Sequence, residues 1–431
     1  MPTPQPLPRH SSRPGRLTAA SLYIVIVVAL VIALLCEALI AGAFYYRAYH
    51  AQRNRLDRLD NRVSSGLNLI LSDGRRADYR NELVDLFERG ADTVRLSRYF
   101  WGGFDIGVSR AGSGRDSAFS AILIGNELDS LSRFAIWLAD EDRPLSVSGR
   151  TAVVGDVYLP KAGVRSAYVN SHSYEGEPGF IAEVHRFSKR ELPEPDILRL
   201  ARIDQSFSAG QAEERFIPDT LTASFGLPTR EYRLKAPFTL KALSLQGNII
   251  IRCDSLLTID STAALEQVMI FAPAIVVRPG FRGRCQLFAR DSISIGDRAT
   301  FAYPSVAAVL RTRAEEAGKQ GFIRFGRSCS FSGGLLAWEK TPGVFPPAVY
   351  LGPKGTYQGQ IYTGLLGLGD STAIAGSVTC RRFFYRSGFS NFENYLIGAR
   401  IDAHALSPFY LSPAVFPGQG ASTKKIVQWL K

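Results

Sequence analysis

The sequence predicts a mainly β fold, with a single N-terminal transmembrane helix and helical stalk, a small α+β region, and then a parallel β-solenoid with a helical insert. Three observations indicate this fold class. Leu257, Ile275 and Ile293 stand 18 residues apart, residues 17–46 contain a single charged side chain, and apolar residues between positions 349 and 378 repeat every 17 positions. A short fixed period is typical of stacked coils, in which each coil buries its inner row against its neighbours.

The first element is an apolar stretch at residues 17–46, preceded by a tail at residues 1–16. Its 30 residues exceed the about 20 that cross a bilayer as a helix. Tyr23 and Tyr46 lie near its two ends, where aromatic side chains favour the headgroup level. We predict a transmembrane helix in contact with membrane lipid. A cleaved signal peptide is the alternative, although the apolar core of such a peptide spans only about 7–15 residues.

The orientation of this span follows less directly from charge. Three arginines precede it and five follow it within 16 residues, so the positive-inside rule does not separate the two sides. We expect a cytoplasmic tail, a single span of the inner membrane and export of the remaining chain. Glu37 lies inside the span, where a carboxylate is costly unless it contacts a partner helix or reaches the interface. Both alternatives stay open, and Glu37 is a candidate contact for a partner in the membrane.

Residues 47–142 predict the helical stalk and the small α+β region. Apolar residues at helical spacing continue the membrane helix, at Leu56, Leu59, Val63, Leu67 and Ile70. Further along, Leu83 and Leu86 indicate a short helix that ends near Gly90. Strands are predicted over Phe104–Val108 and Ala118–Ile124, followed by a helix over Leu128–Leu138.

Residues 143–186 read as the first solenoid coils, because short apolar strands alternate with glycine. Val153 and Val157 flank Gly155, and glycine supplies the positive φ of a tight corner. A charged insert with helical spacing at Ile197 and Leu200 then occupies residues 187–233. The coils are expected to resume after it.

Residues 234–416 predict the main solenoid. Two more columns follow the 18-residue step, one of them Ile259, Val277 and Ile295, the other Ile251, Met269 and Leu287. The 17-residue register relates Val349 to Leu366, Leu351 to Leu368, Tyr357 to Ile374, Gly359 to Gly376 and Ile361 to Val378. Residues 304–320 break the period and predict a bulging loop or helix. The basic tail at residues 417–431 predicts a short capping helix, because an open coil end is an unpaired edge.

Charge and cysteine content exclude several function classes. The formal net charge is +12, but the basic residues are spread along the chain, whereas a nucleic-acid site needs them clustered on one face. We therefore expect no nucleic-acid partner. The five cysteines form neither a CxxC pair nor a cluster with zinc spacing, so we expect no metal and no cofactor, and buried thiols in the strands.

No catalytic constellation accompanies the repeats. His172, His185 and His404 have no evident partner group. Aspartates near coil corners are candidates for sugar chemistry only by residue type, and hydrogen-bonded turns are the commoner role of such residues; they are Asp254, Asp260, Asp291, Asp297 and Asp370. We expect no catalytic residue.

The repeated short apolar strands with glycine corners over residues 238–400 resemble bactofilin-like, polymer-forming β-solenoids. This resemblance implies a protein that assembles. The membrane helix that runs into an amphipathic stalk is similar in outline to type IV pilins and pseudopilins. Gly15 is followed by Arg16 and Leu17, so the prepilin cleavage pattern is absent.

These features predict a membrane-anchored, non-catalytic scaffold or assembly protein of the bacterial cell envelope. Its expected partners are membrane lipid through residues 17–46, other envelope proteins or further copies, with a glycan as a further option. The alternative is a membrane-tethered carbohydrate-active β-helix enzyme or glycan-binding protein, which would carry exposed aromatic residues on one coil face. Tyr357, Tyr362 and Tyr385 are the candidates for such a ligand face.

Overall fold

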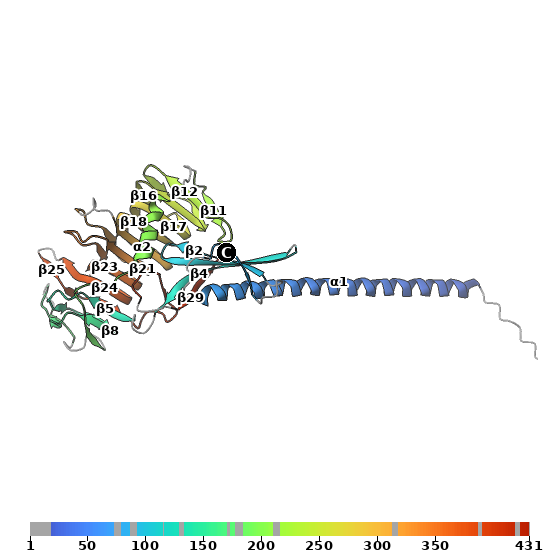
Figure 1. The fold of residues 1–431 in the computed structure, drawn as a ribbon, viewed down its shortest axis with the longest axis horizontal. Coiled ribbons are helices and arrows are strands. Elements are labelled where there is room, and N and C mark those ends of the chain that lie inside the picture. Colours follow the sequence, from blue (N-terminus) through green and yellow to red (C-terminus); the bar gives the residue numbers. More distant parts are fainter. Residues whose placement is uncertain are drawn as a thin grey trace, which may run out of the picture.

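The structure is a computed structural model of the 431-residue chain. The residues that it describes are 19–72, 79–86, 93–114, 116–128, 133–169, 173–176, 184–209, 216–312, 318–386, 390–418 and 423–430. One long helix leads to a body that is mainly β (Figure 1). The predicted tail at residues 1–16 and His172 lie outside the described residues.

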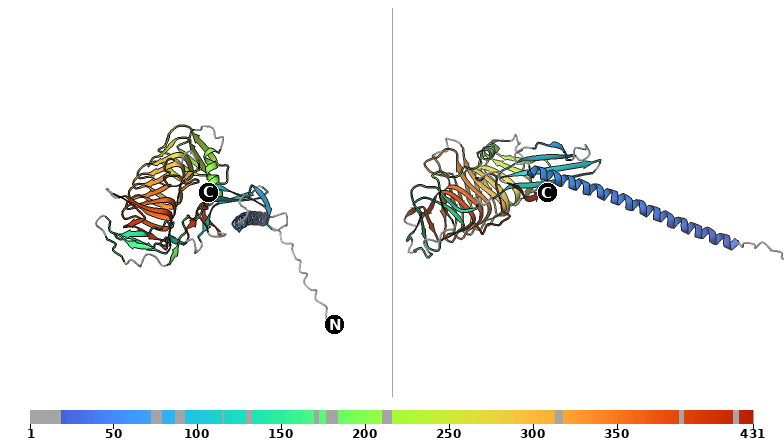
Figure 2. Two further views of the ribbon diagram at one scale, coloured as in Figure 1. Left: turned by 60° about the vertical axis from the view of Figure 1, so that its left-hand side comes forward. Right: turned by 60° about the horizontal axis from the view of Figure 1, so that its bottom comes forward.

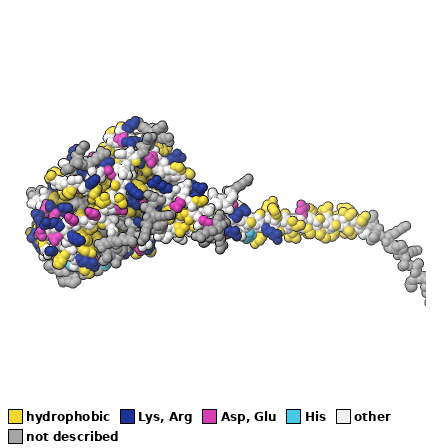
Figure 3. Space-filling model, in the orientation of Figure 1, with side chains coloured by type: hydrophobic (Ala, Val, Ile, Leu, Met, Phe, Trp, Pro, Cys, Tyr) yellow, Lys and Arg dark blue, Asp and Glu magenta, His cyan; other side chains and the backbone are white. Residues whose placement is uncertain are grey.

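Helix α1 (Ala19–Ser72) contains residues 19–46 of the predicted membrane span, and positions 17 and 18 lie outside the described residues. Its first part is apolar and exposed along its whole length, and it is long and apolar enough to cross a bilayer. Hydrophobic side chains cover this part of the helix in Figure 3, and Lys and Arg side chains gather nearer the body. Exposing so long an apolar helix surface to water is unfavourable, which favours a lipid environment for this part of α1.

The last part of α1 packs onto an antiparallel sheet, called the N-terminal sheet below. Leu59, Val63, Leu67 and Ile70 are buried against it, which confirms the predicted apolar stripe. The helix approaches closely at Gly66, where an added Cβ would lie 2.4 Å from Ser109 Oγ. The sheet consists of β1 (Glu82–Asp85), β2 (Thr93–Trp101), β3 (Phe104–Ser113), β4 (Asp116–Glu127), β28 (Leu411–Ser412) and β29 (Lys424–Leu430).

Three segments that were expected to be helical are strands. The first, near Leu83, is the edge strand β1. The second is β5 (Phe134–Leu138), and the third is the basic tail, which forms β29 and pairs antiparallel with β4. Short apolar runs fit either period, and here the open edges of sheets supply the partners that decide the structure. The predicted strands over Phe104–Val108 and Ala118–Ile124 are confirmed within β3 and β4.

The larger part of the body is a solenoid-like pile of parallel strands, called the stack below. In Figure 2 its strands lie side by side in successive layers. Its first layers are β11 (Thr220–Ala223), β12 (Arg230–Leu234), β13 (Phe238–Leu240), β14 (Ser244–Gly247), β15 (Ile249–Cys253) and β16 (Leu256–Ile259). The next are β17 (Ala264–Val277), β18 (Arg282–Ile295), β19 (Thr300–Arg311), β20 (Phe322–Phe325), β21 (Ser330–Glu339), β22 (Ala348–Leu351), β23 (Thr356–Leu368) and β24 (Ala373–Arg386).

Most of the predicted columns are present. Leu257, Ile275 and Ile293 pair in register and are fully buried, and the column of Ile259, Val277 and Ile295 lies beside it. All five pairs of the 17-residue register also hold. Residues 304–311, expected in a bulge, instead continue strand β19.

The column that included Met269 is wrong by one residue. Ile251 pairs with Ile270, and Ile270 pairs with Leu287, so that Met269 faces outward. The register shifts between Glu266 and Val268, and Gln267 between them has a φ of 62°. A bulge adds one residue to a strand and moves every following side chain to the other face.

The order of the layers differs from the order of the chain. Strands from residues 134–187 lie beyond β24, at the end of the stack opposite β11 (Figure 2). The predicted first coils at residues 143–186 are therefore the last layers in space. This end consists of β5, β6 (Leu145–Ser148), β7 (Ala152–Val154), β8 (Asp156–Leu159), β9 (Val164–Ser166), β10 (His185–Phe187), β25 (Asn391–Glu393), β26 (Tyr395–Ile397) and β27 (Arg400–Asp402). Strand β25 pairs antiparallel with β24, a departure from a regular solenoid.

The charged insert contains helix α2 (Ile197–Ser208), as its spacing predicted. Asp196 caps the helix, because its carboxylate accepts a hydrogen bond from the backbone N–H of Arg199 at 2.9 Å. The insert ends earlier than residue 233, since β11 and β12 already belong to the stack. Helix α2 lies on the outer face of the stack, where Phe207 meets Phe271 with ring centroids 5.1 Å apart.

Candidate functional site

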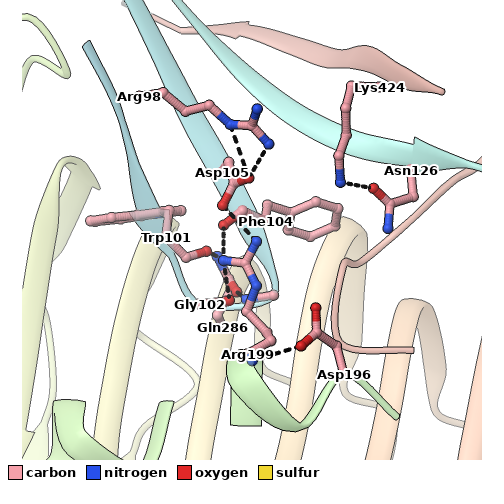
Figure 4. Close-up of polar contacts among 11 residues, drawn as sticks. Arg98, Trp101, Gly102, Phe104, Asp105, Asn126, Asp196, Arg199, Gln286 and Lys424 are labelled. Atoms are coloured by element: carbon pink, nitrogen blue, oxygen red, sulfur yellow. Dashed lines mark hydrogen bonds and ion pairs between the residues drawn. The ribbon is translucent and has the colours of Figure 1, made fainter. Parts of the chain in front are cut away.

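A buried ionic cluster joins the N-terminal sheet to the stack, and we call Arg98, Asp105, Arg199 and Gln286 the joint (Figure 4). One oxygen of Asp105 binds Arg98 Nη2 at 2.8 Å, and the other binds Arg199 Nη2 at 2.6 Å. All four residues are less than one-tenth exposed. A carboxylate shared by two guanidinium groups in this way is held in one place.

Each member of the joint comes from a different element. Arg98 lies on β2, Asp105 on β3, Arg199 on α2 and Gln286 on β18. Gln286 accepts a hydrogen bond from the N–H of Gly103 at 2.7 Å and donates one to the Trp101 carbonyl at 3.0 Å. These bonds attach the β2–β3 turn directly to the stack.

Glycine makes this close approach possible. Gly102 has a φ of 61°, and a Cβ there would lie 2.4 Å from Gln286 Oε1. A backbone carbonyl of the turn is hydrogen-bonded as well, because Arg199 Nη1 donates to Phe104 O at 3.2 Å. The turn therefore leaves few polar groups unpaired, as a buried segment requires.

Charge compensation controls the protonation of the joint. Burial alone would raise the pKa of Asp105, but the charges of Arg199 and Arg98 and their hydrogen bonds outweigh it and hold that pKa below its ordinary value. Lys424 lies nearby and bonds Asn126 Oδ1, and burial lowers its pKa. Asp105 stays ionised and fully engaged, so it is suited to holding elements together rather than to proton transfer.

A second feature is a pocket of about 400 Å³ on the stack, called the Trp338 pocket below. Its floor comes from adjacent strands, with Trp338 on β21 and Tyr362 on β23. The residues before α2 and the loop between β21 and β22 form its sides, and Arg381 and Arg382 of β24 lie at one end. Further lining residues are Glu191, Leu192, Glu194, Ala337, Glu339, Pro342, Gly343, Val344, Pro346, Pro347 and Gly364.

Acidic and basic groups meet in this pocket. Burial raises the pKa of Glu339, although a hydrogen bond from the Gly343 backbone and the charges of Arg311 and Arg381 partly oppose the shift. Burial also raises the pKa of Tyr362, with Glu194 adding to the effect and Arg381 opposing it. Arg381 therefore acts on both groups, and a carboxyl that holds its proton unusually well lies close to an aromatic floor.

The four residues proposed from the sequence are not brought together. Glu37 is exposed in the middle of the apolar part of α1. Tyr357 is 2% exposed in the core of the stack, so the prediction of a ligand face is wrong for it. Tyr362 lines the Trp338 pocket. Tyr385 lies half-buried in a separate groove with Tyr350 and Phe384, where it packs beside Phe392.

Other candidate residues have structural surroundings. Asp260 accepts a hydrogen bond from the backbone N–H of Thr262 two residues on, as turn residues do. Asp297 accepts one from the backbone N–H of Arg327 in the next layer. His185 on β10 and His404 after β27 are both exposed. Within the described ranges, no group of three or more His, Cys, Asp or Glu residues has the arrangement of a metal site. The four cysteines in or next to strands are buried free thiols, as expected: Cys253, Cys285, Cys329 and Cys380.

We found no family model, no curated protein and no solved structure that matches this chain. Sequence reasoning missed Trp338, Glu339, Glu194 and Arg381, which lie together only because separate layers and the insert meet. The proline-rich stretch from Pro342 to Pro347 was the one available signal, since prolines in a loop between strands favour a rigid wall.

Proposed function

We propose that this protein is a membrane-anchored scaffold or assembly protein of the bacterial cell envelope, whose β-solenoid binds other envelope proteins or further copies. The observation that carries the proposal is the joint. It connects the sheet on which α1 packs to the stack through buried charge pairs. A helix in lipid that is rigidly continuous with a long β surface holds that surface at a fixed position relative to the membrane.

The helix also sets a distance from the bilayer. Thirteen positions separate Tyr46 from Leu59, the first buried residue of the helix. At about 1.5 Å per residue the body begins about 20 Å beyond the predicted end of the span. The β3–β4 hairpin extends back along this stretch, where Asp116 pairs with Arg55 at 3.3 Å. The bulk of the chain is proposed to lie outside the inner membrane.

Two features of the stack favour contact with partners. It offers a long surface of repeated strands, the type of surface that solenoids use for extended contacts. Its terminal strand β10 has three exposed residues, among them Phe187, which is 74% exposed. An exposed strand end with an apolar side chain is suited to a protein partner or a second copy.

Site-specific photo-crosslinking in living cells tests the proposal. A benzophenone amino acid is placed singly at the exposed positions Lys161, Lys241 and Lys354 of the stack, with the buried Ile293 as the control. A scaffold gives discrete adducts of defined mass at exposed positions and none at Ile293. Adducts that persist unchanged in a chain without residues 1–46 would contradict the role of the anchor, and an absence of adducts would contradict scaffolding.

The side of the membrane is tested separately by protease protection. Spheroplasts with an intact membrane are treated with protease and probed for the stack. Digestion from outside is expected if the body is exported. Full protection would place the body in the cytoplasm and contradict the proposed location.

A further inference from the structure

We propose that the Trp338 pocket is a binding site for a neutral saccharide. The proposal does not depend on the scaffold role, because it follows from the shape and chemistry of this pocket alone. The pocket volume of about 400 Å³ falls within the range of about 300–1,000 Å³ that small-molecule sites occupy.

The floor of the pocket suits a sugar ring. Trp338 is half-buried and presents part of its aromatic surface, and Tyr362 of the adjacent layer lies buried beside it at 5% exposure. The C–H groups on one face of a pyranose are apolar and pack against such rings, while its hydroxyls point outward toward polar groups. Aromatic side chains give large contact areas at low conformational cost, because their rings are rigid.

The polar groups of the pocket match hydroxyls rather than a charged ligand. Glu194 and Glu339 supply acceptor oxygens and Arg381 supplies N–H donors, so the lining holds both kinds of partner that a hydroxyl needs. Arg382 is already bound by Glu141 and by Glu393, and Arg381 Nη1 lies 3.8 Å from Glu141. The remaining lining therefore carries more acid than base, which disfavours an anionic ligand such as an acidic sugar or a nucleotide.

The pocket is formed before a ligand arrives. Thr363 Oγ1 donates to the Pro347 carbonyl at 3.0 Å, and Gln320 Nε2 donates to the Pro346 carbonyl at 2.9 Å. Gly364 lets this loop approach, because an added Cβ would lie 2.9 Å from Pro346 Cβ. A wall that is fixed in advance lowers the ordering cost of binding.

The edge of the pocket extends the site. Val344 is 82% exposed and lines the pocket, and Phe345 beside it is 55% exposed. Apolar side chains on an exposed lip offer a second surface for the C–H face of a neighbouring sugar unit. We therefore infer an oligosaccharide rather than a single sugar as the ligand.

Calorimetric titration of the full chain in detergent tests this site. The probes are chitotetraose, cellotetraose and maltotetraose, with tetragalacturonate as the acidic counterpart and tetra-alanine as the peptide counterpart. At least one neutral saccharide is expected to bind saturably. Replacing Trp338→Ala is expected to weaken that binding about twofold to twelvefold, which corresponds to the about 0.5–1.5 kcal/mol of an aromatic contact.

Two further variants keep the test decisive. Glu194→Gln changes an exposed residue, leaves the fold intact and is expected to weaken the same saccharide. Trp429→Ala, on β29 and 58% exposed, is the matched control and is expected to change nothing. The inference is overturned if no neutral saccharide binds, if tetragalacturonate or tetra-alanine binds instead, or if Glu194→Gln and Trp338→Ala bind as the unaltered protein does.

Discussion

Replacing Asp105→Asn tests the joint, because the amide keeps the size of the carboxylate and removes its charge. Arg98 and Arg199 then lose the buried carboxylate that both of them bind at less than 3 Å. Removal of one partner of a buried ion pair costs about 3–5 kcal/mol. Arg199 keeps its bonds to the Gly102 and Phe104 carbonyls, so we expect the lower end, about 3 kcal/mol.

The assay is denaturant unfolding of the full chain in detergent, followed by tryptophan fluorescence. Trp101 is buried beside the joint and packs edge-on against Phe225 at 5.2 Å, so its emission reports the local environment. Glu175→Gln is the control, since Glu175 pairs with the exposed Arg150. Such surface pairs contribute only about 0–1 kcal/mol.

The pH dependence of the difference in unfolding free energy between the unaltered protein and Asp105→Asn provides an independent test. The pKa of Asp105 is lower in the folded protein than in the unfolded chain, where it is about 3.9. The stabilisation is therefore fully present above that value and is lost as pH falls through the folded pKa. The gap between the unaltered protein and Asp105→Asn must shrink on acidification. A gap that widens, or a cost no larger than that of Glu175→Gln, would refute the reasoning.

Two more predictions concern the stack and the pocket. Gly359→Ala would place a Cβ 1.9 Å from the Gly333 carbonyl oxygen, at a residue whose φ is 126°. The strained backbone and the steric clash cost about 1–3 kcal/mol each, so we expect the unfolding free energy to fall by about 2–6 kcal/mol. Gly280 also has a positive φ, but a Cβ there would meet no atom within 4 Å, so Gly280→Ala should lose only the backbone-strain part of this stability. Equal losses of unfolding free energy for the two variants would contradict the close contact between Gly359 and Gly333. Burial raises the pKa of Glu339, so unfolding free energy should fall as pH rises from the ordinary glutamate pKa through the folded one, and Glu339→Gln should be more stable than the unaltered protein at pH 7. Parallel pH profiles for the two proteins would contradict this.

The inward columns could be predicted because burial imposes a fixed period. Leu257, Ile275 and Ile293 lie in register because the two coils that separate them have the same length. Met269 could not be placed in the same way, since the bulge at Gln267 lengthens one coil without a local sign in the apolar pattern. The order of the layers could not be predicted from the sequence either, because the parallel pairing of β5 with β24 joins segments more than 200 residues apart.

The burial of Tyr357 and the outward direction of Tyr362 could both have been predicted from the 17-residue period. Tyr357 shares its column with the inward Ile374, so its burial followed from the 17-residue register. Tyr362 follows the inward Ile361, and neighbouring residues of a strand point to opposite faces, so it faces outward. The remainder of the pocket depended on the insert and loop, whose positions no repeat specifies.

The central claim is that the stack is held rigidly to the membrane helix, and distances between spin labels measure this most directly. Labels are placed at the exposed Arg53 of α1 and, in separate samples, at Lys241 or Lys161 on the stack. The background carries Cys36→Ala, because the other four cysteines are buried. In lipid nanodiscs, pulsed electron resonance should give one narrow distance distribution for each pair. Broad or multiple distributions in the unaltered protein would contradict the account.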